Sequence, residues 1–286
     1  MAQHTFFRKY LPLPSKKRYV FYSIGYGLST LIVPFAVQFL VNNLALAGIW
    51  LNTFAFLVII GGGLFLTQVL RYCQFMLNEY LQREIFVTET QLWQKEGLSH
   101  SSPYFFETIM ALKSFSTAFS YVVEIILVAG FGMLAIASFH PLFLVLILLI
   151  GGAIYSVFGY FDHAVITSIE ESNKKYAIFY AIKEDKIVKD SQIDGYLAAR
   201  DVHFTYVKRN TIIVSAIIVL GQLLLLSGGI YLVQKSQISV GQLVSAEIIL
   251  SGILVSIAKL PKALESIYDF ETSQYKLSLA LEDHSG

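Results

Sequence analysis

The chain has 286 residues, of which 55% are hydrophobic and 14% charged, and its net charge is +1. Soluble domains carry roughly 25% charged residues, so this chain has too little polar surface to cover a soluble core of its size. The near-neutral charge also gives no basic field that would attract nucleic acid. The composition therefore predicts a membrane protein, with the lipid bilayer as its environment and no nucleic acid as partner.

Six apolar windows reach the length of about 20 residues that a helix needs to cross the hydrocarbon core. In chain order they are residues 20–41, 49–69, 121–139, 141–161, 211–233 and 240–257. The first window is longer than the ~7–15 apolar residues of a signal peptide, so we interpret it as a retained span. The sequence predicts an all-α membrane protein with six transmembrane helices, in a single domain over residues 1–286.

The positive charges predict the orientation of these spans, because Lys and Arg concentrate in cytoplasmic segments. Of the 21 Lys and Arg residues, all except Lys235 lie in the N-terminal segment, the second or fourth connection, or the C-terminal tail. Both termini are therefore expected in the cytoplasm. The absence of an N-x-S/T glycosylation site favours a bacterial inner membrane.

The two long cytoplasmic connections, at about 71–117 and 162–210, are predicted to be helical extensions of the spans. Neither 64–96 nor 161–194 contains a Gly or Pro. The first stretch is long enough for a helix of about 50 Å, whereas the hydrocarbon core is only about 30 Å thick. Apolar residues at helical spacing, such as Leu77, Leu81, Phe86 and Leu92, would pack the extensions against their neighbours. The alternative is that these helices lie on the membrane surface.

Three short motifs occur in a fixed order relative to the six spans. Residues 238–243, before and into the last span, read ISVGQL and are similar to (I/T)-(S/T)-V-G-x-L. Residues 187–189 read IVK and, with Asp194, resemble (V/I)-(V/I)-K-x-x-x-x-(E/D). Residues 102–106 read SPYFF and resemble S-x-x-(F/Y)-(F/Y). All three are elements of the six-helix transmembrane domain of ABC exporters, which the chain thus resembles over nearly its whole length.

The resemblance implies an ABC-exporter-like fold and a role as permease subunit of an ATP-driven exporter. No G-x-x-x-x-G-K-(S/T) motif, which would cradle nucleotide phosphates, occurs in the sequence. The chain is therefore expected to lack a nucleotide-binding domain, to bind no cofactor itself, and to couple to a separate ABC ATPase that binds ATP and Mg. A second transmembrane subunit, identical or related, is also implied, because family members work as two six-helix halves.

The same resemblance assigns the residues that would couple the permease to the ATPase. They are Ser102, Pro103, Tyr104, Phe105 and Phe106 near the first cytoplasmic turn and Glu184, Asp185 and Lys189 at the second. Glu184 and Asp185 stand where the family usually has a Gly-Ile pair. The aromatic residues would either anchor in a groove of the ATPase or pack against the chain's own helices. The charged residues would either shape the turn or form a solvated face.

Glu247 is the strongest candidate for a functional residue inside the membrane. It lies about 10 Å from the outer end of the last span, where a charged group facing lipid costs ~2.5 kcal/mol or more. It either attracts a cation or proton in the pathway, or hydrogen-bonds to a neighbouring helix. At 100° per residue, Gln242, Ser245 and Ser256 share one face of this helix, with Glu247 and Ser251 nearly opposite. Either face is a candidate for the pathway lining.

Two other functions are compatible with six spans. One is a secondary transporter or channel that needs no ATPase, and the other is a membrane scaffold. The sequence has no internal repeat and no pair of spans interrupted by Gly or Pro at corresponding places, which would favour a secondary transporter. No nucleophile–base pair and no metal-ligand spacing is visible, so no catalytic or metal-binding residue is predicted.

Overall fold

The computed structural model describes residues 13–45, 53–95 and 102–285. Every regular element within these ranges is helical, which confirms the predicted all-α fold for this part of the chain. The elements are α2 (Pro14–Ser29), α3 (Ile32–Leu40), the short π-helix η1 (Val41–Ala45), α4 (Thr53–Lys95), α5 (Ser102–Ala137), α6 (Pro141–Phe158), α7 (Phe161–Lys183), α8 (Asp190–Gln234), α9 (Val240–Ile257) and α10 (Leu260–Ser285).

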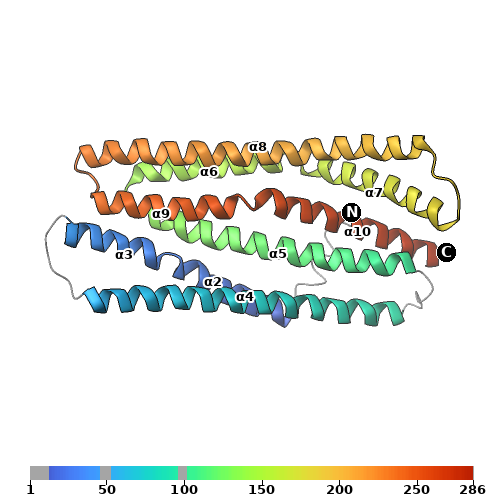
Figure 1. The fold of residues 1–286 in the computed structure, drawn as a ribbon, viewed down its shortest axis with the longest axis horizontal. Coiled ribbons are helices and arrows are strands. Elements are labelled where there is room, and N and C mark those ends of the chain that lie inside the picture. Colours follow the sequence, from blue (N-terminus) through green and yellow to red (C-terminus); the bar gives the residue numbers. More distant parts are fainter. Residues whose placement is uncertain (1–12, 46–52, 96–101, 286) are drawn as a thin grey trace.

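Six helical passes within the described ranges are long and apolar enough to cross a membrane. They lie alongside one another in a single elongated bundle (Figure 1). The passes are Pro14–Asn43, Phe56–Gln91, Glu107–Ala137, Pro141–Lys183, Asp190–Gln234 and Val240–Leu277. Each predicted span overlaps one of these passes, so the expected number of spans is confirmed. The arrangement indicates a multi-pass membrane protein.

The two ends of the bundle are distinguished by the turns that lie there. The turns at 138–140 and 235–239 define one end, which we call the short-turn end, and the turn at 184–189 lies at the other, the tip end (Figure 1). Helix α8 has 45 residues and is therefore about 68 Å long. Because the hydrocarbon core is only about 30 Å thick, roughly half of α8 projects beyond it. The charge pattern predicts that this projecting half is cytoplasmic.

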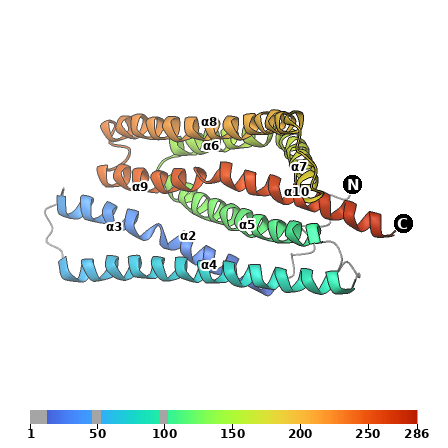
Figure 2. The same ribbon diagram turned by 45° about the vertical axis from the view of Figure 1, so that its right-hand side comes forward.

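Three of the passes are broken near their middle, and two breaks have a proline as their cause. Pro34 and Pro261 each lack a backbone N–H and crowd the carbonyl four residues earlier. The breaks fall accordingly at residues 30–31, between α2 and α3, and at 258–259, between α9 and α10. The third break lies at Gly159 and Tyr160, where α7 leaves the line of α6 and descends toward α10 (Figures 1 and 2).

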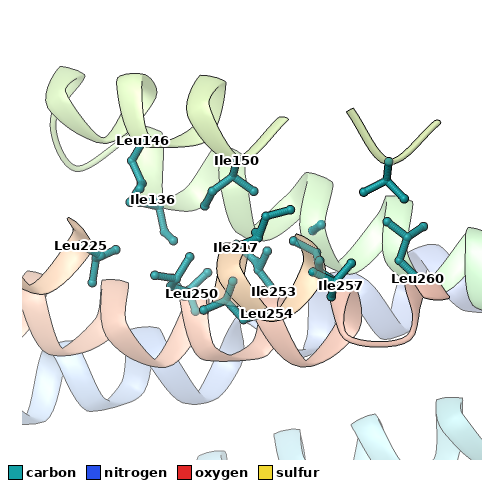
Figure 3. Packing of buried hydrophobic residues seen from close by; sticks show 14 of the residues in the cluster. Ile136, Leu146, Ile150, Ile217, Leu225, Leu250, Ile253, Leu254, Ile257 and Leu260 are labelled. Carbon is teal, nitrogen blue, oxygen red and sulfur yellow. The ribbon is translucent and has the colours of Figure 1, made fainter. Parts of the chain in front are cut away.

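The core runs through the whole length of the bundle. Its larger cluster surrounds α9, whose residues Ile253 and Ile257 are almost completely buried. Side chains from α5, α6, α8 and α10 pack around these residues (Figure 3). A second cluster, including Leu81, Phe115 and Phe270, joins α4, α5 and α10 in the projecting half. Of the apolar residues predicted to pack the first extension, Leu81 is buried and Leu77 packs against this cluster, whereas Phe86 is 40% exposed. The side chain of Leu92 lies outside the described residues.

Candidate functional site

The turn between α7 and α8 closes the tip end with a defined hydrogen-bond pattern. The N–H of Asp185 donates to the carbonyl of Ile182 at 3.1 Å, and that of Lys186 donates to the carbonyl of Ala181 at 2.9 Å. This is the Schellman pattern, which places Asp185 at a φ of 55°, where glycine is usual. Glu184 Oε2 and Lys186 Nζ form an ion pair of 2.5 Å. Their hydrogen bond, reinforced by their opposite charges, lowers the pKa of Glu184 and raises that of Lys186.

The second half of this turn presents an apolar side chain to solvent. Ile187 is 91% exposed, although an isoleucine normally avoids water. Lys189 shapes the turn through its backbone, because its N–H donates to Gln192 Oε1 at 3.0 Å and its carbonyl accepts from the N–H of Gln192 at 2.9 Å. The side chains of Lys189 and Asp194 are both exposed and form no ion pair with each other. The turn is therefore a rigid loop that carries one protruding aliphatic residue.

The other predicted coupling residues, 102–106, form the first turn and a half of α5. Pro103 falls within the first turn of the helix, where proline is tolerated because its missing N–H has no partner within the helix. The side chains of 102–106 and the preceding connection lie outside the described residues. Figure 1 places the start of α5 at the tip end, the same end as the turn at 184–189.

In the membrane-spanning part, Glu247 of α9 contacts α8. The side-chain amide of Gln222 donates a hydrogen bond to Glu247 Oε1. One turn farther along α9, Ser251 is exposed. A face that carries a carboxylate and a hydroxyl is unfavourable against lipid. This side of α9 is thus suited to a polar space or to another protein surface.

The opposite polar face of α9 is turned into the chain. Ser245 and Ser256 are 0% and 4% exposed. Gln242 completes a capping box at the start of the helix: its side-chain oxygen accepts from the N–H of Ser239 at 2.8 Å, and its own N–H donates to Ser239 Oγ at 3.1 Å. Of the two faces that the sequence left open, the one with Glu247 and Ser251 is accessible from outside the chain. Gln242 caps the helix, the hydroxyl of Ser256 donates to the carbonyl of Gly252 at 3.1 Å, and Ser245 is buried without a hydrogen-bond partner among the described residues.

We expect the Glu247–Gln222 contact to stabilise the packing of α8 on α9. Glu247→Ala should lower the free energy of unfolding by about 1 kcal/mol, the range of interhelical hydrogen bonds in membranes. Glu247→Gln should leave it nearly unchanged, because an amide oxygen can still accept from Gln222. Thermal unfolding in detergent measures both. Ser215→Ala is the control, since that exposed hydroxyl on α8 bonds only the carbonyl of Thr211 in its own helix. Equal stability of wild type and Glu247→Ala would show that the contact contributes nothing.

A second cross-helix contact lies at the break between α9 and α10. Lys259 Nζ is 2.6 Å from Glu124 Oε1 of α5, and the two side chains are 30% and 21% exposed. Glu124 is about 20 Å from the short-turn end of α5 at 1.5 Å per residue, so it lies within the depth of the hydrocarbon core. The ammonium group of Lys259 pairs with this carboxylate, because a charged group inside the membrane is unfavourable without a partner. The ion pair therefore ties the broken pass to its central neighbour.

The projecting half encloses a polar cavity of about 450 Å³ between α5, α7, α8 and α10. Arg200 Nη1 lies 2.7 Å from Glu171 Oε1 at its edge. The buried Lys276 lies 3.4 Å from Glu107 Oε1, which also accepts a hydrogen bond from the hydroxyl of Tyr176. These partners are 29 to 169 residues apart in the chain, so no local sequence signal predicts the cavity. No cluster of His, Cys, Asp and Glu suited to a metal ion occurs among the described residues.

The described residues thus form two candidate sites, namely the turn at 184–189 and the open face of α9 around Glu247. The first is a turn at the tip end with one protruding aliphatic side chain, and the second is a polar face at membrane depth. No protein-family model and no curated protein matches this chain.

Proposed function

We propose that the chain is the permease subunit of an ATP-driven exporter, coupled to a separate ABC ATPase through its tip end. The observation that carries the proposal is the length of the passes. Helices such as α8, at about 68 Å, run from the short-turn end through the bilayer and as far again beyond it. The extensions are also packed as a bundle, so a force applied at the turn 184–189 is transmitted along stiff helices into the membrane.

The three motifs support the same proposal from the sequence. Two of them, 102–106 and 187–189, lie at the tip end where an ATPase would dock, and the third, 238–243, lies at the short-turn end. The protruding Ile187 supplies an apolar anchor, the kind of residue that dominates the energy of an interface when a pocket receives it. ATP and Mg would be bound by the ATPase partner.

The pathway in this proposal lies between this chain and a second six-helix subunit. The open face of α9, with Glu247 and Ser251, supports a polar cavity on that side, because lipid would disfavour it. ATP-driven closure of the ATPase at the tip end would tilt the extensions. The pathway between the two subunits would then open alternately to the two sides of the membrane. The breaks at 159–160 and 258–259 are the places where the extensions can bend relative to the spans.

The proposal is tested by isolating the chain from its native membrane in a mild detergent. We expect a nucleotide-binding protein with a G-x-x-x-x-G-K-(S/T) motif to be isolated with it in a fixed ratio. Isolation of an intact, folded chain without any such protein, together with transport that proceeds without ATP, would favour a secondary transporter instead.

Ile187→Asp should separate docking from folding. Because Ile187 is 91% exposed, the variant should unfold at the same temperature as the wild type. Loss of a buried anchor typically costs 2 kcal/mol or more at an interface, so the amount of ATPase isolated with the chain should fall about tenfold or more. Val202→Asp is the control, since Val202 is 52% exposed on α8 and about 18 Å from the start of that helix. Equal effects of the two substitutions would contradict docking at the turn.

A further inference from the structure

A groove of about 590 Å³ lies between α2 and α4, away from the candidate sites above. Two cations of α2, Lys17 and Arg18, lie on its rim. The aromatic rings of Phe21 and Tyr72 flank it and are 72% and 63% exposed. Its apolar wall includes Met76 of α4. The groove therefore combines positive charge, amphipathic rings and an apolar surface.

The two cations are free to bind a ligand. Lys17 and Arg18 are exposed and form no ion pair with any residue that the structure describes. The carboxylates on the neighbouring turns of α4 have other partners, because Glu79 pairs with Arg83 at 2.9 Å and Glu84 accepts from the N–H of Ser15 at 3.4 Å. The charge at the rim of the groove is thus not neutralised from within the described chain.

The position of the groove along α4 places it at the level of the lipid head groups. Tyr72 and Leu77 lie about 29 Å and 36 Å from the first residue of α4, at 1.5 Å per residue. The hydrocarbon core is about 30 Å thick, so the groove lies at the level of the lipid head groups on the side of the tip end. Exposed aromatic rings are typical of that level. Toward the bilayer centre, beyond the groove, Ile24 and Leu28 are exposed on the same face of α2 as Phe21.

We propose that this groove binds an anionic phospholipid. The phosphate of the head group lies between Lys17 and Arg18, and an acyl chain follows the apolar face of α2 toward Leu28. Basic pockets between membrane helices on the cytoplasmic side bind acidic head groups. The proposal does not depend on the transport function, since it rests only on the groove, its charge and its depth.

The native Cys73 provides the readout, because it lines the groove and is the one cysteine of the sequence. The full chain is placed in nanodiscs of phosphatidylcholine, with or without phosphatidylglycerol, and its alkylation by an uncharged maleimide is timed. We expect phosphatidylglycerol to slow the reaction about fivefold or more. Inorganic phosphate added to the phosphatidylcholine discs should have no such effect. Equal protection by phosphate would assign the site to a free anion instead of a lipid.

In the double variant Lys17→Gln/Arg18→Gln, phosphatidylglycerol should slow the alkylation of Cys73 much less than it does in the wild type. A negative surface also slows the alkylation of any nearby thiol, but that general effect would persist in the variant. Lys113→Gln is the matched control, because Lys113 is exposed on α5 at about 36 Å from the short-turn end, the depth of the groove. The proposal is overturned if both lipids give the same rate, if phosphatidylglycerol protects the double variant as strongly as the wild type, or if Lys113→Gln removes protection as well.

Discussion

Replacing Gly241 by alanine is expected to lower the free energy of unfolding by about 2–3 kcal/mol. A methyl group at this position would lie 2.4 Å from Asn42 Oδ1 and 2.7 Å from the backbone oxygen of Gln38. The backbone of α3 cannot move away as a flexible side chain would, and overpacking of this kind costs about 1–3 kcal/mol. The hydrogen bond from the N–H of Gly241 to Asn42 Oδ1, 3.2 Å long, would be strained as well.

The control for this prediction lies on the same helix. A methyl group at Gly252 meets no heavy atom within 4 Å among the described residues. Gly252→Ala should therefore be neutral, or stabilising by up to about 1 kcal/mol through its higher helix propensity. Unfolding in detergent, followed by the loss of helical circular dichroism, compares the two variants. If Gly241→Ala proved as stable as Gly252→Ala, the close approach of α3 and α9 would be wrong.

Lys259→Met is expected to lower the free energy of unfolding by about 2 kcal/mol. The substitution leaves Glu124 without its partner at a depth where an unpaired charge is unfavourable. Removing one partner of a fully buried ion pair costs about 3–5 kcal/mol, and the value here is smaller because both side chains retain some exposure. The same unfolding measurement applies, together with the yield of folded protein in the membrane.

A double variant separates the lost pairing from the lost lysine side chain. In Lys259→Met/Glu124→Gln no charge is left unpaired, so most of the stability should return. Lys262→Met is the control three residues away, since its ion pair with Glu265, 3.2 Å long, is exposed and worth little. A double variant as unstable as Lys259→Met alone would mean that the lysine acts through packing and not through its charge.

The sequence predicted the passes well because the signal for each is local. Length and hydropathy are sufficient to identify six windows, and the absence of Gly and Pro over 64–96 indicates the continuous helix that the structure shows as far as Lys95. The windows at 20–41 and 141–161 were read as uninterrupted, although the chain breaks at 30–31 and 159–160. Pro34 is a visible cause of the first break, whereas Gly159 alone does not predict the second, because glycine is tolerated in membrane helices.

The side-chain partners were not predictable, because they depend on how distant helices pack. The faces of α9 could be separated by their angle, but only the packing of the neighbouring helices shows that Glu247 meets Gln222 and that Ser245 is buried. The pairing of Lys259 with Glu124 spans 135 residues and has no local signal. The glycine of the ISVGQL motif is a different case. The motif identified the position, and the close contact with Asn42 explains why a glycine is needed there.

The central claim is that this chain is a permease coupled to a separate ATPase. The most direct test of this claim is the rate of ATP hydrolysis. The nucleotide-binding protein isolated with the chain is assayed in proteoliposomes alone, with the wild-type chain, and with Ile187→Asp. We expect the wild-type chain to change the rate of hydrolysis severalfold and Ile187→Asp to remove most of that change. An unchanged rate in all three preparations, with the chain folded and correctly inserted, would contradict the proposed coupling.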